Sequence, residues 1–266
     1  MNQLFSRVLT FVVSLTTASM CLANAITPPD VYRTVQVTTI DYPPLMGPKE
    51  GLMTDLVRAA FNSQSYSVNF VIVPMARIPW SFTHSNSDAV LGSILWFKEK
   101  NVIENISFQT IYYSGVHFFY RKAQFPSGIA YDELSELDQY KIGYIQSGSI
   151  LRLLNESGIY PQLVKDLTTN TRKLKTERID MFIATELGGW GAIKKIYPDK
   201  VAQFAMTPRP ILDVMGSGDI LFPNKSRHLK EIFAAGFSKL KADGNYLKIL
   251  EQYYGKGNIP ENLLTL

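Results

Sequence analysis

Cysteine is almost absent from this chain of 266 residues. The single cysteine, Cys21, lies within the first 25 residues, and the remainder of the sequence has none. A chain without further cysteine forms no disulfide and offers no thiolate to a metal ion or a substrate. The sequence therefore excludes disulfide-stapled domains, cysteine-ligated zinc sites and cysteine nucleophiles.

Concentrated charge is also missing. The residues are 46% hydrophobic and 19% charged, with a formal net charge of +4, which is typical of a globular protein with a sizeable core. The longest basic clusters hold two or three residues, whereas a nucleic-acid-binding protein concentrates basic charge on one face. We therefore expect no nucleic-acid partner.

The common catalytic and metal-binding motifs do not occur. The sequence has no G-x-S-x-G, H-E-x-x-H, P-loop or G-x-G-x-x-G pattern. Its three histidines, His84, His117 and His228, lie too far apart to give a ligand spacing. Ser238 and Lys241 match S-x-x-K, but they fall in an amphipathic helix without the partner motifs. We expect no catalytic residue, no metal and no cofactor.

The first 25 residues have the composition of a secretory signal peptide. Arg7 precedes a mostly apolar run at residues 8–15, and Ala23-Asn24-Ala25 is an A-x-A cleavage signal. The run is shorter than the roughly 20 apolar residues that span a bilayer, and no later run reaches that length. We predict cleavage after Ala25 and export to the periplasm. Lipidation of Cys21 is the alternative, although Met20 stands where a lipoprotein signal has a small residue.

Strand and helix patterns alternate through the rest of the chain. Residues 34–40, 68–73 and 88–95 are predicted strands, and residues 52–61 and 76–84 are predicted helices. This order predicts a parallel sheet with right-handed crossovers. A second unit of the same kind follows, with predicted strands at 141–145, 163–164 and 178–185 and helices from 149 and around 170–177.

Two extended segments, 116–121 and 215–223, separate the two units, and two amphipathic helices end the chain. We predict an α/β fold of two lobes, each a mostly parallel sheet flanked by helices, with these segments as crossover strands. The expected limits are 1–25 for the signal peptide, 26–120 with 222–266 for the first lobe, and 121–221 for the second.

Short motifs follow one another along nearly the whole chain after the signal: Tyr42-Pro43-Pro44, Gly51 with Asp55-Leu56-Val57, Ser107-Phe108, Tyr112-Tyr113, Leu137, Lys141-Ile142-Gly143, Gly148-Ser149, Arg178-Ile179-Asp180, Lys241-Ala242-Asp243-Gly244 and Tyr253-Tyr254-Gly255. Their order resembles the periplasmic solute-binding proteins of ABC transporters, in particular the polar amino acid-binding type of family 3. The resemblance implies the type II periplasmic-binding-protein fold. It also implies a monomer that holds a small polar ligand, an amino acid or a related carboxylate or amine, between its lobes for an ABC permease.

Candidate ligand contacts in the first lobe lie at the ends of strands, where open parallel sheets bind ligands. Tyr42 follows the first strand, and the two prolines after it fix an extended turn. Ser93 ends the third strand, and the resemblance implies that it helps to hold a carboxylate. Trp96 and Tyr113 complete this set. Packing of Tyr42 beneath a loop and of Ser93 within a strand are the structural alternatives.

Two residues are candidates for binding an anionic group of the ligand, and the sequence does not decide between them. The resemblance implies an Arg shortly after the third strand, but the segment there contains no Arg and offers Lys100. Arg77, after the second predicted strand, has the planar bidentate geometry that suits a carboxylate. A solvated surface lysine is the alternative for Lys100.

In the second lobe, Ser147 and Ser149 precede a predicted helix, whose N-terminal N–H groups suit an anion or a serine cap. The resemblance implies a carboxylate for a ligand amine shortly after Asp180, and we assign this role to Glu186. Trp190 is a candidate second aromatic wall.

Two other functions fit the same residues. The chain would serve a sensor system instead of a transporter if its partner were a kinase. Less favoured is a hydratase or dehydratase on this fold, with Glu186 and Lys100 as acid–base groups.

Overall fold

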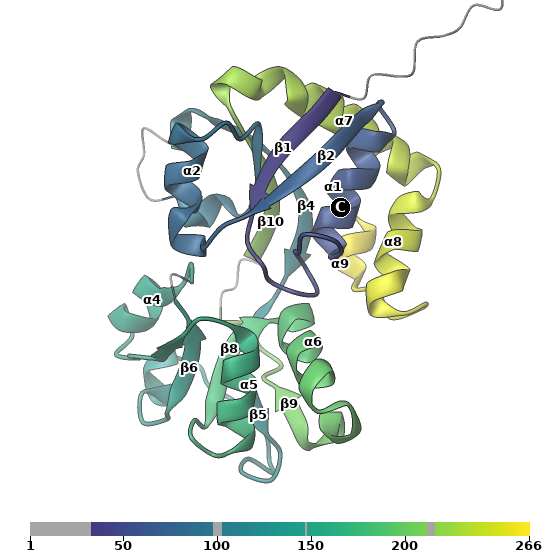
Figure 1. Cartoon of the computed structure of the whole chain (residues 1–266). Helices are drawn as coiled ribbons and strands as arrows, with labels where there is room; N and C mark the ends of the chain where they lie inside the picture. Colours follow the sequence, from purple (N-terminus) through teal and green to yellow (C-terminus); the bar gives the residue numbers. More distant parts are fainter. Residues whose placement is uncertain (1–32, 98–102, 147, 212–215) are drawn as a thin grey trace, which may run out of the picture. The chain divides into compact units, whose positions relative to one another are not determined.

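The computed structural model describes residues 33–97, 103–146, 148–211 and 216–266. The predicted signal peptide and the candidates Lys100 and Ser147 lie outside these ranges. Within them, two sheets of five strands each form, and helices cover both (Figure 1). The α/β prediction with two mostly parallel sheets is confirmed. Of the described helices, none is long and apolar enough to cross a membrane.

The first sheet has the strand order β2-β1-β3-β10-β4. Strand β1 pairs in parallel with β2 and β3, whereas β10 runs antiparallel to both of its neighbours. The four other strands therefore share one direction. Their bounds are Arg33–Thr39 for β1, Tyr66–Ile72 for β2, Ala89–Gly92 for β3, Ile106–Ser114 for β4 and Gly216–Pro223 for β10.

The second sheet, β7-β6-β8-β5-β9, repeats this pattern with β5 as the reversed strand. Strand β5 follows β4 of the first sheet after Gly115, and β10 is reached from β9 of the second sheet. Each reversed strand thus enters its sheet from the other one. The bounds are Val116–Arg121 for β5, Ile142–Ile145 for β6, Gln162–Val164 for β7, Met181–Thr185 for β8 and Phe204–Met206 for β9.

These strands bear on the expected lobe limits. The chain passes from the first sheet to the second at Gly115, and β10 belongs wholly to the first sheet. The limits at 120 and 222 remain a prediction, and the exchange between sheets occurs several residues before each of them.

The helices gather beside their own sheets (Figure 1). Helix α1 packs on α7 and α8 beside the first sheet, and α5 packs on α6 beside the second. Their apolar faces form two core clusters, one with Phe61 and Phe233 and the other with Phe118 and Phe182. The bounds are Leu52–Asn62 for α1, Ile78–His84 for α2, Leu151–Glu156 for α4, Leu167–Lys175 for α5, Glu186–Ile196 for α6, Arg227–Ala242 for α7, Asn245–Tyr254 for α8 and Glu261–Leu264 for α9.

A buried carboxylate connects the crossover strand β10 to the turn after β3. Asp219 is fully buried, and its Oδ2 accepts a hydrogen bond of 2.9 Å from the Ile94 N–H. Its Oδ1 accepts one of 2.8 Å from the Thr110 hydroxyl. Buried carboxylates are retained where such donors compensate for lost hydration. Asp219 therefore fixes the start of the η2 turn, Ile94–Trp96.

We expect Asp219→Ala to lower the free energy of unfolding by about 2–3 kcal/mol, because it leaves a backbone donor and a hydroxyl without their acceptor. Urea unfolding measures this loss. Asp199→Ala, at an exposed position, is the control and should change stability by less than about 0.5 kcal/mol. Equal effects of the two substitutions would contradict the role given to Asp219.

Tyr246, in helix α8, is a buried residue of the first core, where it contacts helices α7 and α9. Its ring meets Phe237 edge-on at 5.5 Å between centroids, and its hydroxyl donates to the Leu263 carbonyl at 3.0 Å. Burial, with a smaller contribution from Tyr112, raises the pKa of Tyr246 to about 12. The folded state therefore favours the neutral phenol.

A raised pKa makes stability fall with alkaline pH. Below pH 10 the phenol is neutral in both states; between pH 10 and about 12 only the unfolded state ionises, so the stabilisation is lost across that window. Phenylalanine has no group that ionises here. We therefore expect the free energy of unfolding of Tyr246→Phe to fall less steeply between pH 10 and 12 than that of the natural chain. Chemical unfolding at pH 9, 10, 11 and 12 gives the slope of the free energy of unfolding against pH for each chain. Identical slopes would show that Tyr246 does not have the raised pKa.

Candidate functional site

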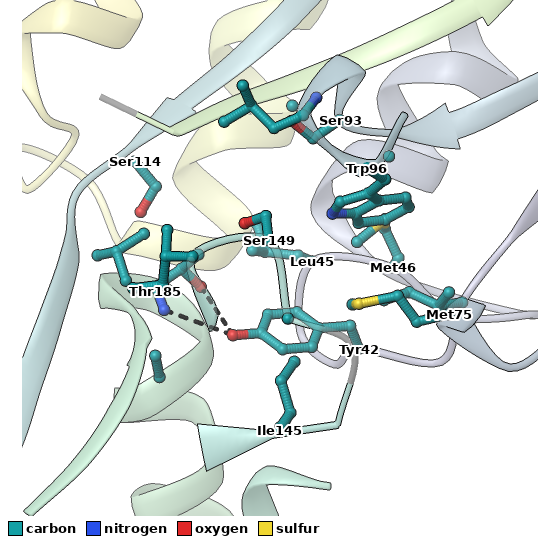
Figure 2. Close-up of a pocket in the computed structure, with 18 of the residues that line it drawn as sticks. Tyr42, Leu45, Met46, Met75, Ser93, Trp96, Ser114, Ile145, Ser149 and Thr185 are labelled. Carbon is teal, nitrogen blue, oxygen red and sulfur yellow. Dashed lines mark hydrogen bonds between the residues drawn. The ribbon is translucent and has the colours of Figure 1, made fainter. Parts of the chain in front are cut away.

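A cavity of about 100 Å³ lies where strands of both sheets end. Its wall takes residues from the carboxyl ends of β1 and β3 in the first sheet and of β6 and β8 in the second. Of the predicted ligand contacts, the structure brings four together here: Tyr42, Ser93, Trp96 and Ser149 (Figure 2).

Tyr42 spans the cavity from the first-sheet side to the second. Its backbone pairs with Met46, which holds the loop after β1 in a tight turn. Figure 2 shows its hydroxyl pointing toward Thr185. There it shares a hydrogen bond of 3.3 Å with Oγ1 and accepts one of 3.4 Å from the Thr185 N–H. Burial raises the pKa of the Tyr42 phenol, and the bonds to Thr185 oppose that shift.

Helix α6 allows Tyr42 to come this close because it presents Gly188. A Cβ at that position would lie 2.8 Å from a ring carbon of Tyr42 and 2.7 Å from Thr185 Oγ1. Thr185 also caps the helix, since its side chain accepts a hydrogen bond from the Gly188 N–H. Residues 185–188 therefore both begin helix α6 and form the surface against which the Tyr42 ring packs.

The turn after β3 supplies Ser93 and Trp96. Ser93 caps the η2 turn by accepting a hydrogen bond of 3.2 Å from the Leu95 N–H. The Trp96 ring lies over Gly92, where a Cβ would overlap it. This close approach, together with the bond from Ile94 to Asp219, sets the position of the indole in the wall.

The second-sheet wall contains Tyr144, Ile145, Ser149 and Thr185. Burial strongly raises the pKa of Tyr144, whose hydroxyl accepts a hydrogen bond of 3.5 Å from the Ile150 N–H. The sequence offered Ser147 or Ser149 as a cap for this helix. Helix α4 starts at Leu151 with Ile150 at its N-cap position, so Ser149 is not the N-cap residue, and Ser147 lies outside the described residues. Ser149 instead acts on Tyr144, since it opposes the rise that burial causes in the pKa of the Tyr144 phenol.

Tyr112 lines the cavity from β4, whereas the predicted Tyr113 does not. Neighbouring residues in a strand point to opposite faces, so only one of the pair can reach the cavity. Tyr113 packs, half-buried, against the first core. The Tyr112 hydroxyl lies 2.8 Å from that of Tyr254. Burial, then the charges of Tyr254 and Glu186, raise the pKa of Tyr112 well above its ordinary value.

Three other predicted residues lie away from the lining. Arg77 is exposed in the η1 turn, Met75–Arg77. Glu186 opens α6, half-buried, with its N–H donating to the Gly115 carbonyl at 3.0 Å. Trp190, further along α6, meets Phe119 edge-on at 5.3 Å between centroids. The roles given to them remain predictions.

Several lining residues were not predicted. Met53 lies in the first turn of α1. The others share positions near strand ends or in the turns that follow strands, and that placement is the signal that could have identified them: Met46, Met75, Tyr112, Ser114, Tyr144 and Thr185. Met75 contacts both cores, as Tyr42 does. In Figure 2 its sulfur lies beside the Tyr42 ring, near Met46 and Trp96.

The wall is uncharged over the described part of the chain. Its polar groups are serine and threonine hydroxyls and tyrosine phenols, and no Asp, Glu, Lys, Arg or His side chain among the described residues lines it. Nor do three acidic or histidine side chains in those ranges gather into a metal site. The arrangement can hydrogen-bond and enclose a small molecule, and it shows no nucleophile–base pair.

A wider groove of about 810 Å³ adjoins the cavity. Both include Tyr42, Met75 and Ile145 in their linings, so these side chains stand between the two spaces. The groove, unlike the cavity, carries charge of both signs, from Asp41 and Glu50 to Lys165 and Lys195.

Comparison with known proteins gives one family match. The model of the bacterial extracellular solute-binding proteins, family 3, matches residues 36–256. No curated protein matches the sequence.

Solved structures resemble the fold at low sequence identity. A histidine kinase sensor domain similar to periplasmic binding proteins has a TM-score of 0.68 at 20% identity, covering 85% of this chain and 98% of its own. A Streptococcus pneumoniae ABC uptake transporter substrate-binding protein with bound histidine has 0.68 at 13%, covering 85% and 94%. A Salmonella typhimurium periplasmic binding protein with high arginine specificity has 0.65 at 20%, covering 83% and 99%. The fold is the type II periplasmic-binding-protein fold.

The close approach of the Trp96 ring to Gly92 can be tested by adding a side chain at position 92. Gly92→Ala should displace the indole and change its fluorescence emission, because the added Cβ occupies the place of the ring. The measurement is made in a Trp80→Phe and Trp190→Phe background, so that only Trp96 emits. An unchanged spectrum would show that the ring does not rest on Gly92.

Proposed function

Because the chain belongs to the bacterial extracellular solute-binding proteins, family 3, we propose that it captures a small polar ligand and delivers it to an ABC permease. The cavity at the joined strand ends of the two sheets carries this proposal. It occupies the place where open α/β sheets bind ligands. The known structures with this fold include proteins that bind amino acids, in keeping with a solute-binding role.

The ligand contacts that we propose are the predicted residues in the wall. Trp96 covers one side with its ring, and Tyr42 closes the side toward the groove. Ser93 and Ser149 add hydroxyls from the two sheets. With a volume of about 100 Å³, well below the ~300–1,000 Å³ of pockets for drug-sized molecules, the cavity suits a small ligand.

We also propose where the protein acts and in what oligomeric state. The signal peptide over residues 1–25 would direct the chain to the periplasm, where it acts as a monomer beside the permease. No turnover is part of this function, and the family and the similar structures are binding proteins.

A sensing role is the second candidate, favoured by the similarity to a histidine kinase sensor domain. The partner then is a receptor, while the ligand site stays the same. A permease gene or a histidine-kinase gene beside the coding sequence distinguishes the two roles. Crosslinking of the exported protein in intact cells identifies the membrane partner directly.

We expect a small molecule to co-purify with the exported protein and to be released unchanged on unfolding. Native mass spectrometry, followed by analysis of the released molecule, identifies it. Added back at about 100 times its dissociation constant, it should stabilise the fold by about 2.7 kcal/mol, which is a rise of about 5–10 °C in Tm.

A matched pair of variants locates the molecule in the cavity. Trp96 lines the cavity, whereas Trp80 is exposed on α2. Trp96→Phe should abolish the ligand-dependent change in fluorescence and weaken binding, and Trp80→Phe should preserve both. Loss of the signal in Trp80→Phe alone would place the ligand elsewhere, and a ligand converted to product would indicate an enzyme.

A further inference from the structure

Helix α6 carries three glycines, and they meet different parts of the molecule. Gly189 faces the core of its own sheet, where a Cβ would lie 2.2 Å from the Phe119 ring. Gly188 and Gly191 instead meet the loop after β1 of the other sheet. None of the three has a positive φ, so the backbone would accept alanine, which is a better helix former. Tertiary contacts, and not backbone conformation, therefore account for these glycines.

Gly188 and Gly191 lie three residues apart and so share one face of the helix, which we call the glycine face. A Cβ at Gly188 would lie 2.8 Å from a ring carbon of Tyr42, and one at Gly191 would lie 2.5 Å from Cδ of Pro44. Carbon atoms in favourable contact are about 3.5–4.0 Å apart. Two rings of one loop therefore pack on the glycine face at distances that no side chain there would permit.

The loop that packs on the glycine face is fixed to helix α1 beside the first sheet. The Pro44 carbonyl accepts a hydrogen bond from the Leu52 N–H, and the Leu45 carbonyl accepts one from the Met53 N–H, both at 2.9 Å. The Leu45 side chain is buried in the first core. The loop therefore cannot leave α6 by itself without breaking these bonds, so separation moves the two sheets apart.

Gly191 acts from outside the cavity. Gly191 and Pro44 line the wider groove, and neither is among the residues that line the cavity. Tyr42, two residues before Pro44, lines both spaces. The contact between Pro44 and Gly191 thus lies on the groove side of the Tyr42 ring. It can hold the cavity closed without touching a molecule inside it.

We infer that Gly188 and Gly191 are positioning residues for solute binding, because their lack of side chains lets the Tyr42–Pro44 loop pack on α6 and close the cavity. This inference rests on the proposed solute-binding function and deepens it. A methyl group at Gly191 displaces Pro44, and the first sheet moves with the loop. The closed form is then less populated, and the apparent affinity for a solute falls with that population.

Gly191→Ala tests the inference on the exported protein. We expect it to retain less of the co-purified molecule than the natural chain in native mass spectrometry, by about 5-fold or more, because its closed form is less populated. Its radius of gyration in small-angle X-ray scattering should be larger. After bound molecules have been removed by unfolding and refolding, its Tm should nevertheless be unchanged or higher, because alanine favours the helix and the opened form has room for the methyl group.

Gly189→Ala is the matched control on the same helix. Its methyl group meets Phe119 within the second core whether the sheets are together or apart, so it should lower the Tm of the emptied protein. Lys194→Ala, at an exposed position of α6, should change neither Tm nor the radius of gyration. A radius of gyration of Gly191→Ala equal to that of the natural chain overturns the inference. A Tm lowered as far as in Gly189→Ala also overturns it, since Gly191 would then be a core residue only.

These outcomes are separable from failure of the proposed function. If the natural chain carries a small molecule and Gly191→Ala retains it fully, the solute-binding function stands and the positioning role is refuted. If nothing co-purifies with the natural chain, and no solute raises its Tm, the solute-binding function itself fails. The comparison of radii of gyration still decides in that case whether the glycine face holds the two sheets together.

Discussion

The contact between Tyr42 and the start of α6 is the constraint on which the cavity depends. Tyr42 packs against the core of each sheet, and its hydroxyl reaches both Oγ1 and the N–H of Thr185. Leu187, one residue before Gly188, belongs to the first core although it lies in α6. The Tyr42 ring therefore stands, with Met75 and Ile145, between the small cavity and the wider groove, and it connects the two halves of the cavity wall.

The same contact explains an unusual helix. Glycine in a helix interior costs about 1 kcal/mol relative to alanine, so a sequence with several glycines argues against a helix at residues 186–196. Alanine at position 188 would nevertheless clash with the Tyr42 ring. Propensity is overridden because the small residue permits a tertiary contact that a better helix former would prevent.

This conflict between local and tertiary preference marks the limit of prediction from the sequence. The alternating patterns predicted the parallel units, and the motif order predicted the family, because both depend on residue type and spacing. Side-chain direction depends on register and packing, which spacing does not provide. Tyr113 was chosen where Tyr112 faces the cavity, and Glu186 where Thr185 does. No helix was predicted at residues 186–196, where α6 forms, and the exposure of Arg77 follows from a turn that residue pattern does not reveal.

The tyrosines and hydroxyls of the cavity wall are held in place by the fold itself. Burial raises the pKa of the cavity tyrosines, so they remain uncharged hydrogen-bonding groups. The hydroxyls of Thr185, Ser93 and Ser114 are bonded to the Gly188 N–H, the Leu95 N–H and the Gly115 carbonyl. The same bonds that cap α6 and the η2 turn therefore fix these hydroxyls in the wall, so local structure and the cavity lining depend on the same groups.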